Sequence, residues 1–103
     1  MTYRIIIEPT AEHEIRAAVR WKTENSSFAV AGRWYNNVLK KIRTLRTHPA
    51  RCPLASENDR VPLEIRELLH GRRRDVFRII FTIQDESVVI LYIRHSAQQE
   101  LEP

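Results

Sequence analysis

Cysteine and glycine are almost absent from this chain of 103 residues, which has one cysteine and two glycines. A single thiol excludes an internal disulfide framework and is typical of a reducing compartment, so we expect a cytoplasmic protein. So few glycines, with only five prolines, argue against a linker-rich or disordered chain. Histidine and cysteine do not occur at the spacing of metal ligands, and there is no glycine-rich phosphate loop. The sequence therefore predicts neither a metal nor a cofactor.

Long hydrophobic runs are lacking as well. The longest, 5–7 and 88–93, have the length of strands and are far too short to span a bilayer. The first residues lead into a strand-like run rather than into the apolar segment of a signal peptide. A chain of this length has room for one core. We therefore expect one domain over residues 1–103, with no membrane partner.

Acidic residues are missing from one long segment. Residues 25–56 contain six lysines and arginines and no aspartate or glutamate, within a net charge of +4 for the whole chain. This asymmetry indicates a polyanion or an acidic protein as partner. A solvated basic surface that keeps the protein soluble explains the same segment without a partner.

The spacing of apolar residues predicts the order strand, helix, helix, strand, strand, strand. A β-branched run at 3–7 comes first, and Thr10 is the expected N-cap of a helix that extends to about Glu24. Ser27 is expected to cap a second helix that ends before His48. Its apolar positions recur in steps of three and four, the strongest helical pattern of the chain. They are Phe28, Ala31, Tyr35, Val38, Ile42 and Leu45, and Trp34 lies off this stripe as a possible exposed contact.

Three strands are expected in the last third of the chain, over 63–69, 76–83 and 88–95, with Gly71 at the turn after the first. A helical hairpin followed by such strands predicts an α+β fold. In it, the hairpin packs on one face of a mainly antiparallel sheet.

Strand residues alternate between the two faces of a sheet. The alternation buries Phe77, Ile79, Phe81 and Ile83 against the helices, together with Val89, Leu91 and Ile93. The other face is expected to be open, and we call it the arginine face. Its expected members are Arg66, Val76, Arg78, Ile80, Val88, Ile90, Tyr92 and Arg94.

The arginine face combines cations with apolar side chains. Arginines beside a tyrosine suit a phosphate or a carboxylate-rich partner. Apolar side chains on an open face indicate a docking surface, a dimer contact or tolerated exposure. The alternative without a functional role is an internal lattice in which Glu64 or Asp75 pairs with the arginines.

The ordered set of Ile65-Arg66-Glu67-Leu68, Gly71, Phe77 to Phe81 and Val89 to His95 resembles the RelE/ParE superfamily of type II toxin–antitoxin toxins. The C-terminal strand is most similar to ParE-like, plasmid-stabilisation-type members. The resemblance implies a growth-inhibiting cytoplasmic toxin encoded beside an antitoxin, whose C-terminal segment docks on the sheet and neutralises it. Operator DNA would be contacted only through the antitoxin.

The resemblance leaves the target open. ParE-like members poison DNA gyrase, which the strand sequence favours, whereas RelE-like members cleave mRNA on the ribosome. In an mRNA endonuclease without a metal, Arg78 would hold the scissile phosphate, and Arg94 and His95 would assist. His95 has the opposite alternation from Arg94, so a structural role at the strand end is its other interpretation. A non-toxic member that only binds the antitoxin or acts as a corepressor is the third possibility. The residues assigned to target or antitoxin binding are Arg66, Val76, Arg78, Ile80, Ile90, Tyr92 and Arg94.

Overall fold

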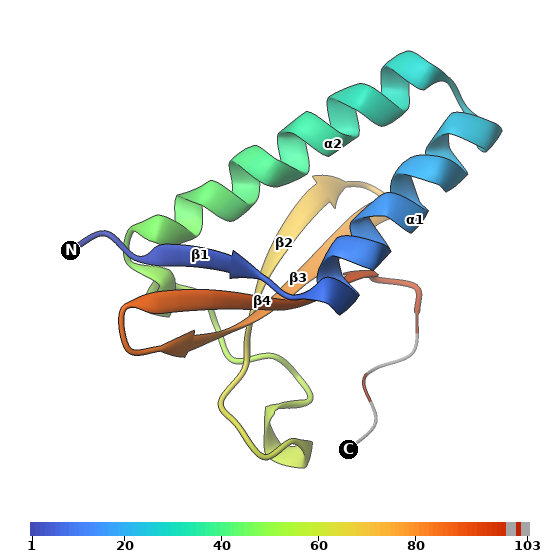
Figure 1. The fold of residues 1–103 in the computed structure, drawn as a ribbon. Helices are drawn as coiled ribbons and strands as arrows, with labels where there is room; N and C mark the ends of the chain where they lie inside the picture. The colour runs from blue at the N-terminus through green and yellow to red at the C-terminus, as the bar shows by residue number, and fades with distance from the viewer. Residues whose placement is uncertain (99–100, 102–103) are drawn as a thin grey trace.

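The computed structural model describes residues 1–98 and residue 101, and it has the predicted α+β architecture (Figure 1). Its strands and helices are β1 (Arg4–Ile7), α1 (Pro9–Asn25), α2 (Phe28–Arg43), β2 (Arg66–Arg72), β3 (Asp75–Gln84) and β4 (Ser87–His95). Short 3-10 helices lie at Thr44–Arg46, Pro49–Arg51 and Asn58–Arg60. The strand order is β1-β4-β3-β2, with β1 parallel to β4 and the other neighbours antiparallel. Within the described residues, neither helix has the length and apolar character needed to cross a membrane.

The starts of the two helices differ in how well the sequence predicts them. α1 begins at Pro9 after an N-cap at Glu8, so the expected cap at Thr10 is wrong. Proline suits the first helical position because its missing N–H would have no partner there. Ser27 caps α2 as predicted, because its Oγ accepts a hydrogen bond from the backbone N–H of Val30 at 3.1 Å.

The buried stripe of α2 contains Ala31, Val38 and Ile42 as predicted, but Trp34 takes the place expected for Tyr35. Its buried residues are Ala31, Trp34, Val38 and Ile42. Trp34 is only 8% exposed, so the expectation of an exposed contact is wrong, and its ring lies 4.9 Å from that of Phe77. Phe28 and Tyr35 are instead exposed at 84% and 42%. The reason is that α2 packs against both α1 and the sheet, so the residues of α2 that face these two elements are the ones that are buried.

A β-bulge in β4 reverses part of the predicted alternation. Ile80 pairs with Tyr92 while Phe81 pairs with Ile90, which leaves Leu91 without a partner opposite it. An extra residue of this kind shifts every side chain on one side of it to the other face.

The predicted faces are therefore wrong in the first half of β4. Val88 and Ile90 lie in the main core with the helices rather than on the arginine face. Val89 pairs with Thr82, and Leu91 packs beside Ile80 on the opposite side. After the bulge, the residues of β4 face as predicted.

The second face of the sheet is covered by the chain itself. A second core cluster forms there from Ala55, Ile65 and Ile80, and Tyr92 and Leu101 pack against it. Figure 1 shows the yellow-green segment between the 3-10 helix at Pro49–Arg51 and β2 on the opposite side of the strands from α2. We call this segment, residues 53–65, the covering loop. The expectation of an open face is wrong, because Ile80 is fully buried beneath this loop.

The covering loop also explains the late start of β2. Ile65 donates its N–H to Asn58 Oδ1 at 2.8 Å, and its carbonyl accepts from Ala55 N at 2.9 Å, so it belongs to the loop and not to the sheet. β2 then starts at Arg66 rather than at residue 63 and runs through Gly71, where a turn was expected.

Candidate functional site

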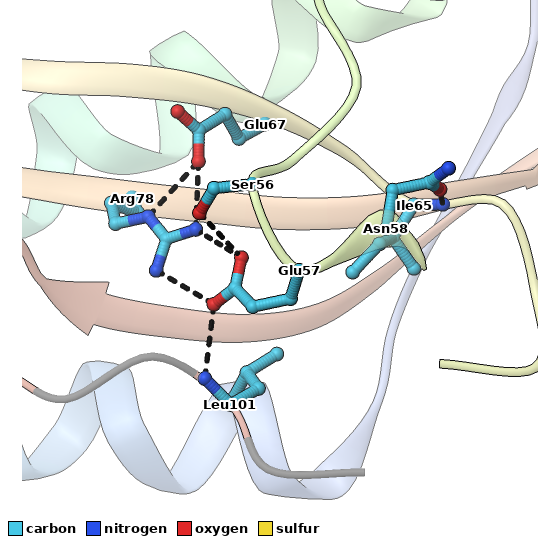
Figure 2. Close-up of polar contacts among 7 residues, drawn as sticks. All are labelled: Ser56, Glu57, Asn58, Ile65, Glu67, Arg78 and Leu101. Atoms are coloured by element: carbon cyan, nitrogen blue, oxygen red, sulfur yellow. Dashed lines mark hydrogen bonds and ion pairs between the residues drawn. The ribbon is translucent and has the colours of Figure 1, made fainter. Parts of the chain in front are cut away.

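The centre of the arginine face is a closed ion-pair network (Figure 2). Arg78, on β3, is 8% exposed and donates Nη1 and Nη2 to the two carboxylate oxygens of Glu57 in the covering loop. Its Nε donates to Glu67 Oε1 on β2 at 2.9 Å, and Nη2 lies 2.8 Å from the same oxygen. Every nitrogen of the guanidinium group therefore contacts a carboxylate. The partners of Arg78 are Glu57 and Glu67, whereas Glu64 of the predicted lattice pairs with Arg66.

Glu57 is fully buried, and yet it is charged. Hydrogen bonds from Arg78 lower its pKa from 4.5 to about 2, against the effect of burial, and the backbone N–H of Leu101 adds a hydrogen bond at 3.0 Å. The hydrogen bond to Glu57 also raises the pKa of Arg78 above its usual value. The pair thus holds the covering loop and Leu101 against the sheet as a charged unit.

Arg94 and Tyr92 lie on the same face as Arg78, as predicted. Arg94 stands directly opposite Arg78 in the β3–β4 pairing, and its Nη1 is 3.9 Å from Glu14 Oε2 of α1. Tyr92 is half-buried against the second cluster. Glu14 also accepts the N–H of Ile93 at 2.8 Å, and burial raises the pKa of this carboxyl. β1 pairs with β4 only as far as Ile90, and beyond that point α1 lies beside β4 instead.

Arg66 does not join the arginine face. It pairs with Phe81, which points to the helices, so the predicted shared face with Arg78 is wrong because β2 starts in a different register. Its Nη1 donates to the carbonyl of Cys52 at 2.7 Å, and its Nη2 lies 3.2 Å from Glu64 Oε1. This arginine ties the chain after α2 to the start of β2.

The remaining predicted site residues are dispersed. Val76 is half-buried two residues before Arg78, while Ile80 and Ile90 are fully buried in different clusters. His95 lies on the helix side, away from Arg78, as its alternation indicated. Its ring is 5.0 Å from that of Phe77.

The sequence did not indicate a groove that opens between α1 and the ends of β3 and β4. Its volume is about 580 Å³. Its walls are mainly apolar and are formed by Ala17, Ala18, Trp21, Phe77, Ile93 and Ala97. We call it the α1 groove. Residues from α1 and from strands more than fifty positions later form it, so no local pattern could have predicted it.

Charged side chains border the α1 groove. Lys22 Nζ lies 2.6 Å from Asp75 Oδ2 and 5.6 Å from the ring centroids of Trp34 and Phe77. His95 Nε2 is 3.4 Å from the other oxygen of Asp75. Trp21 is 62% exposed on the same wall. An exposed aromatic next to an apolar hollow with a charged border suits a protein partner. Within residues 1–98 and 101, no group of three or more histidine, cysteine, aspartate or glutamate side chains is placed to hold a metal ion.

The arrangement of elements occurs in a solved structure. The structure is similar to a solved chain described as "Chromosomal ParDE TA system from P. aeruginosa", with a TM-score of 0.77 and 17% sequence identity, covering 91% of this chain and 96% of that one. At this identity, the likeness shows the fold.

The sequence supplies the family. Residues 5–100 match the family described as "ParE toxin of type II toxin-antitoxin system, parDE", and the chain belongs to that family. The resemblance to the ParE branch is thereby confirmed. No curated protein matches the sequence.

Proposed function

We propose that this protein is the toxin of a type II toxin–antitoxin module, that it inhibits growth by acting on DNA gyrase in the cytoplasm, and that a cognate antitoxin neutralises it. The observation that carries the proposal is the family match over residues 5–100. Operator DNA is reached through the antitoxin, in the manner that the resemblance implies.

The state of Arg78 favours action on gyrase over cleavage of mRNA. Cleavage by a neighbouring 2′-hydroxyl needs a cation on the phosphorane, and an acid and a base within hydrogen-bond reach. Arg78 is held by Glu57 and Glu67, so a phosphate would have to displace a buried carboxylate. His95 lies on the other face of the sheet, against Phe77. The two groups that an endonuclease would need are thus separated by the sheet.

The α1 groove is the surface on which we expect gyrase to dock. Trp21 is its exposed aromatic, and Lys22, Asp75 and His95 border it. Large aromatic side chains in an apolar hollow contribute most of the binding energy in many protein interfaces. Glu14 also lines the groove, and its Oε2 lies 3.9 Å from Nη1 of Arg94.

A supercoiling assay with gyrase and ATP tests this function directly. The wild-type protein should inhibit supercoiling, and Trp21→Ala should raise the concentration needed by about thirtyfold, as the loss of a hot-spot residue requires. Phe28→Ala is the matched control, because Phe28 is 84% exposed on α2 and does not line the groove. It should behave as the wild type does.

Other outcomes separate the alternatives. No response of gyrase to a stoichiometric excess of the wild-type protein would refute the proposed target. New mRNA ends in primer extension after induction would then support the endonuclease. If expression without the neighbouring gene leaves growth unchanged, the protein is a non-toxic antitoxin-binding member.

A further inference from the structure

The exposed side of α2 carries a line of cations. Arg33, Asn36, Lys40 and Arg43 recur in steps of three and four, and all four side chains are exposed. Because an α-helix has about 3.6 residues per turn, this line lies opposite the buried stripe of α2. Figure 1 shows α2 along one border of the molecule, with α1 and the sheet on one side of it. We call these four residues the α2 ridge, and it faces solvent.

The fold does not use the cations of the α2 ridge. Among the described residues, none of Arg33, Lys40 and Arg43 forms an ion pair or donates a side-chain hydrogen bond. Residues 25–56 contain no aspartate or glutamate, so α2 has no acidic side chain of its own to neutralise them. Arg66 and Arg78 on the sheet, by contrast, each pair with a carboxylate. The ridge therefore carries positive charge that is available to an anion.

The end of the ridge is positively charged as well. A helix C-terminus carries a partial negative charge on its free carbonyls, which would repel an anion. Arg51 offsets this charge, because its Nη1 donates to the carbonyls of Thr47 at 2.8 Å and of His48 at 3.2 Å. Its Nη2 donates to Thr44 Oγ1 at 3.0 Å, and Arg46 is exposed in the same segment. A phosphate at this end would therefore meet cations rather than a row of free carbonyls.

A second group of cations lies beside α2. Burial, and next the positive charge of Lys41, lower the pKa of His70, so Lys41 of α2 is close to β2. Arg72, at the end of β2, is exposed and pairs with Asp75, whose carboxylate contacts Lys22 of α1. Residues opposite each other on paired strands place their side chains on the same face. The cationic surface therefore continues from α2 to the end of β2, on the side of the sheet that the helices cover.

The shape of the α2 ridge favours double-stranded DNA among polyanions. The major groove of B-form DNA is about 12 Å wide and admits an α-helix, whereas that of duplex RNA is deep and narrow. Single-stranded nucleic acids are bound by stacking on aromatic side chains, and no residue of the ridge is aromatic. From Arg33 to Arg43 the ridge extends about 15 Å, beside about nine charges of a DNA duplex. Asn36 adds an amide donor between the cations, a group that also binds phosphate oxygens.

We propose that the α2 ridge binds the phosphate backbone of double-stranded DNA, with α2 lying along the major groove. Arg33, Lys40 and Arg43 would each contact a phosphate, and Lys41 and Arg72 would add attraction at longer range. Phosphate contacts carry no sequence information, so this binding is separate from the recognition of an operator. The proposal goes beyond the proposed function and does not rest on it, because neither gyrase nor the antitoxin takes part.

Titration of a short labelled DNA duplex without an operator sequence, followed by fluorescence anisotropy, tests the ridge. The logarithm of the wild-type association constant should fall against the logarithm of salt concentration with a slope of about −2.7, for three phosphate contacts. The double variant Lys40→Gln, Arg43→Gln removes two of them. It should bind about tenfold or more weakly at about 50 mM salt, with a slope smaller by about 2.

A matched control separates the ridge from net charge. The double variant Arg16→Gln, Arg20→Gln removes two exposed cations of α1, so it changes the net charge by the same amount. Its affinity for the duplex should stay within about threefold of wild type, with the same slope. Glutamine is a good helix former, so circular dichroism should show that both double variants are folded.

Three outcomes would overturn the proposal. Wild type that does not bind the duplex at about 50 mM salt would leave the ridge as a solvated surface. Equal weakening by the α1 and α2 double variants would mean that net charge alone attracts DNA. Duplex RNA of the same sequence should bind more weakly, and equal binding would refute the placement of α2 in the major groove. None of these results bears on gyrase inhibition, because no residue of the α2 ridge lines the α1 groove.

Discussion

Replacing Arg78 with alanine should destabilise the fold severely. The change would leave the fully buried carboxylate of Glu57 with the N–H of Leu101 at 3.0 Å and the hydroxyl of Ser56 at 3.2 Å. Removing one partner of a buried pair costs about 3–5 kcal/mol, because the other charge stays buried without its partner. That is a large part of the about 5–15 kcal/mol by which a domain is stable. Urea unfolding followed by circular dichroism should show a midpoint lowered by about 2 M.

The same pair predicts how stability depends on pH. The folded pKa of Glu57 is about 2, below its ordinary value of 4.5, so the contribution is complete above pH 4.5. It is lost as the pH falls from 4.5 towards 2, because protonation then favours the unfolded chain. A shift of this size corresponds to about 3 kcal/mol. The slope of stability against pH in this window should be much smaller in a Glu57→Gln variant.

Two controls make the test of the buried pair sharp. Arg16 and Glu12 form an ion pair of 2.8 Å on the exposed side of α1, with side chains that are 72% and 55% accessible. Arg16→Ala should change the unfolding free energy by less than about 0.5 kcal/mol. The double variant Arg78→Met, Glu57→Met removes both charges and should recover much of the loss. If Arg78→Ala costs less than about 1 kcal/mol, the account of the buried pair is refuted.

Local backbone geometry gives further predictions, all measurable by thermal unfolding. Gly71→Ala should destabilise by about 2 kcal/mol or more, since φ is 120° and a Cβ would lie 2.1 Å from the carbonyl oxygen of Asp75. Gly32→Ala should stabilise by about 0.5–1 kcal/mol, because a Cβ there meets nothing within 4 Å inside α2; destabilisation would contradict the open space. Ser27→Ala should cost about 1 kcal/mol through loss of the cap on Val30, and no change would mean that the cap is replaceable.

Patterns that repeat along one element were sufficient to predict the fold. The alternation of Phe77, Ile79 and Phe81 gives the helix-facing side of β3, and the structure buries all three there. Ser27 marks the start of the second helix of the hairpin, and the cap at Ser27 is the predicted one. In each case, neighbours in the sequence contain the physical reason, whether burial on one face or a hydrogen bond within one turn.

Features that depend on distant segments were not predictable in this way. The bulge at Leu91 depends on the register in which β4 pairs with β3. The sequence of β4 alone does not show that its side chains change faces there. The covering loop comes from residues whose apolar positions have no period, so neither the burial of Ile80 nor the pairing of Glu57 with Arg78 follows from spacing. Spacing alone therefore predicts that Arg78 is available for a ligand, whereas Glu57 and Glu67 bind it in the structure.

Closure of the arginine face restricts where partners can bind. With Arg78 and Ile80 buried beneath the covering loop, a partner can reach neither side chain without displacing residues 53–65. The α1 groove needs no such displacement, because Trp21 on its wall is 62% exposed. The groove is therefore the surface to which the proposed function leads.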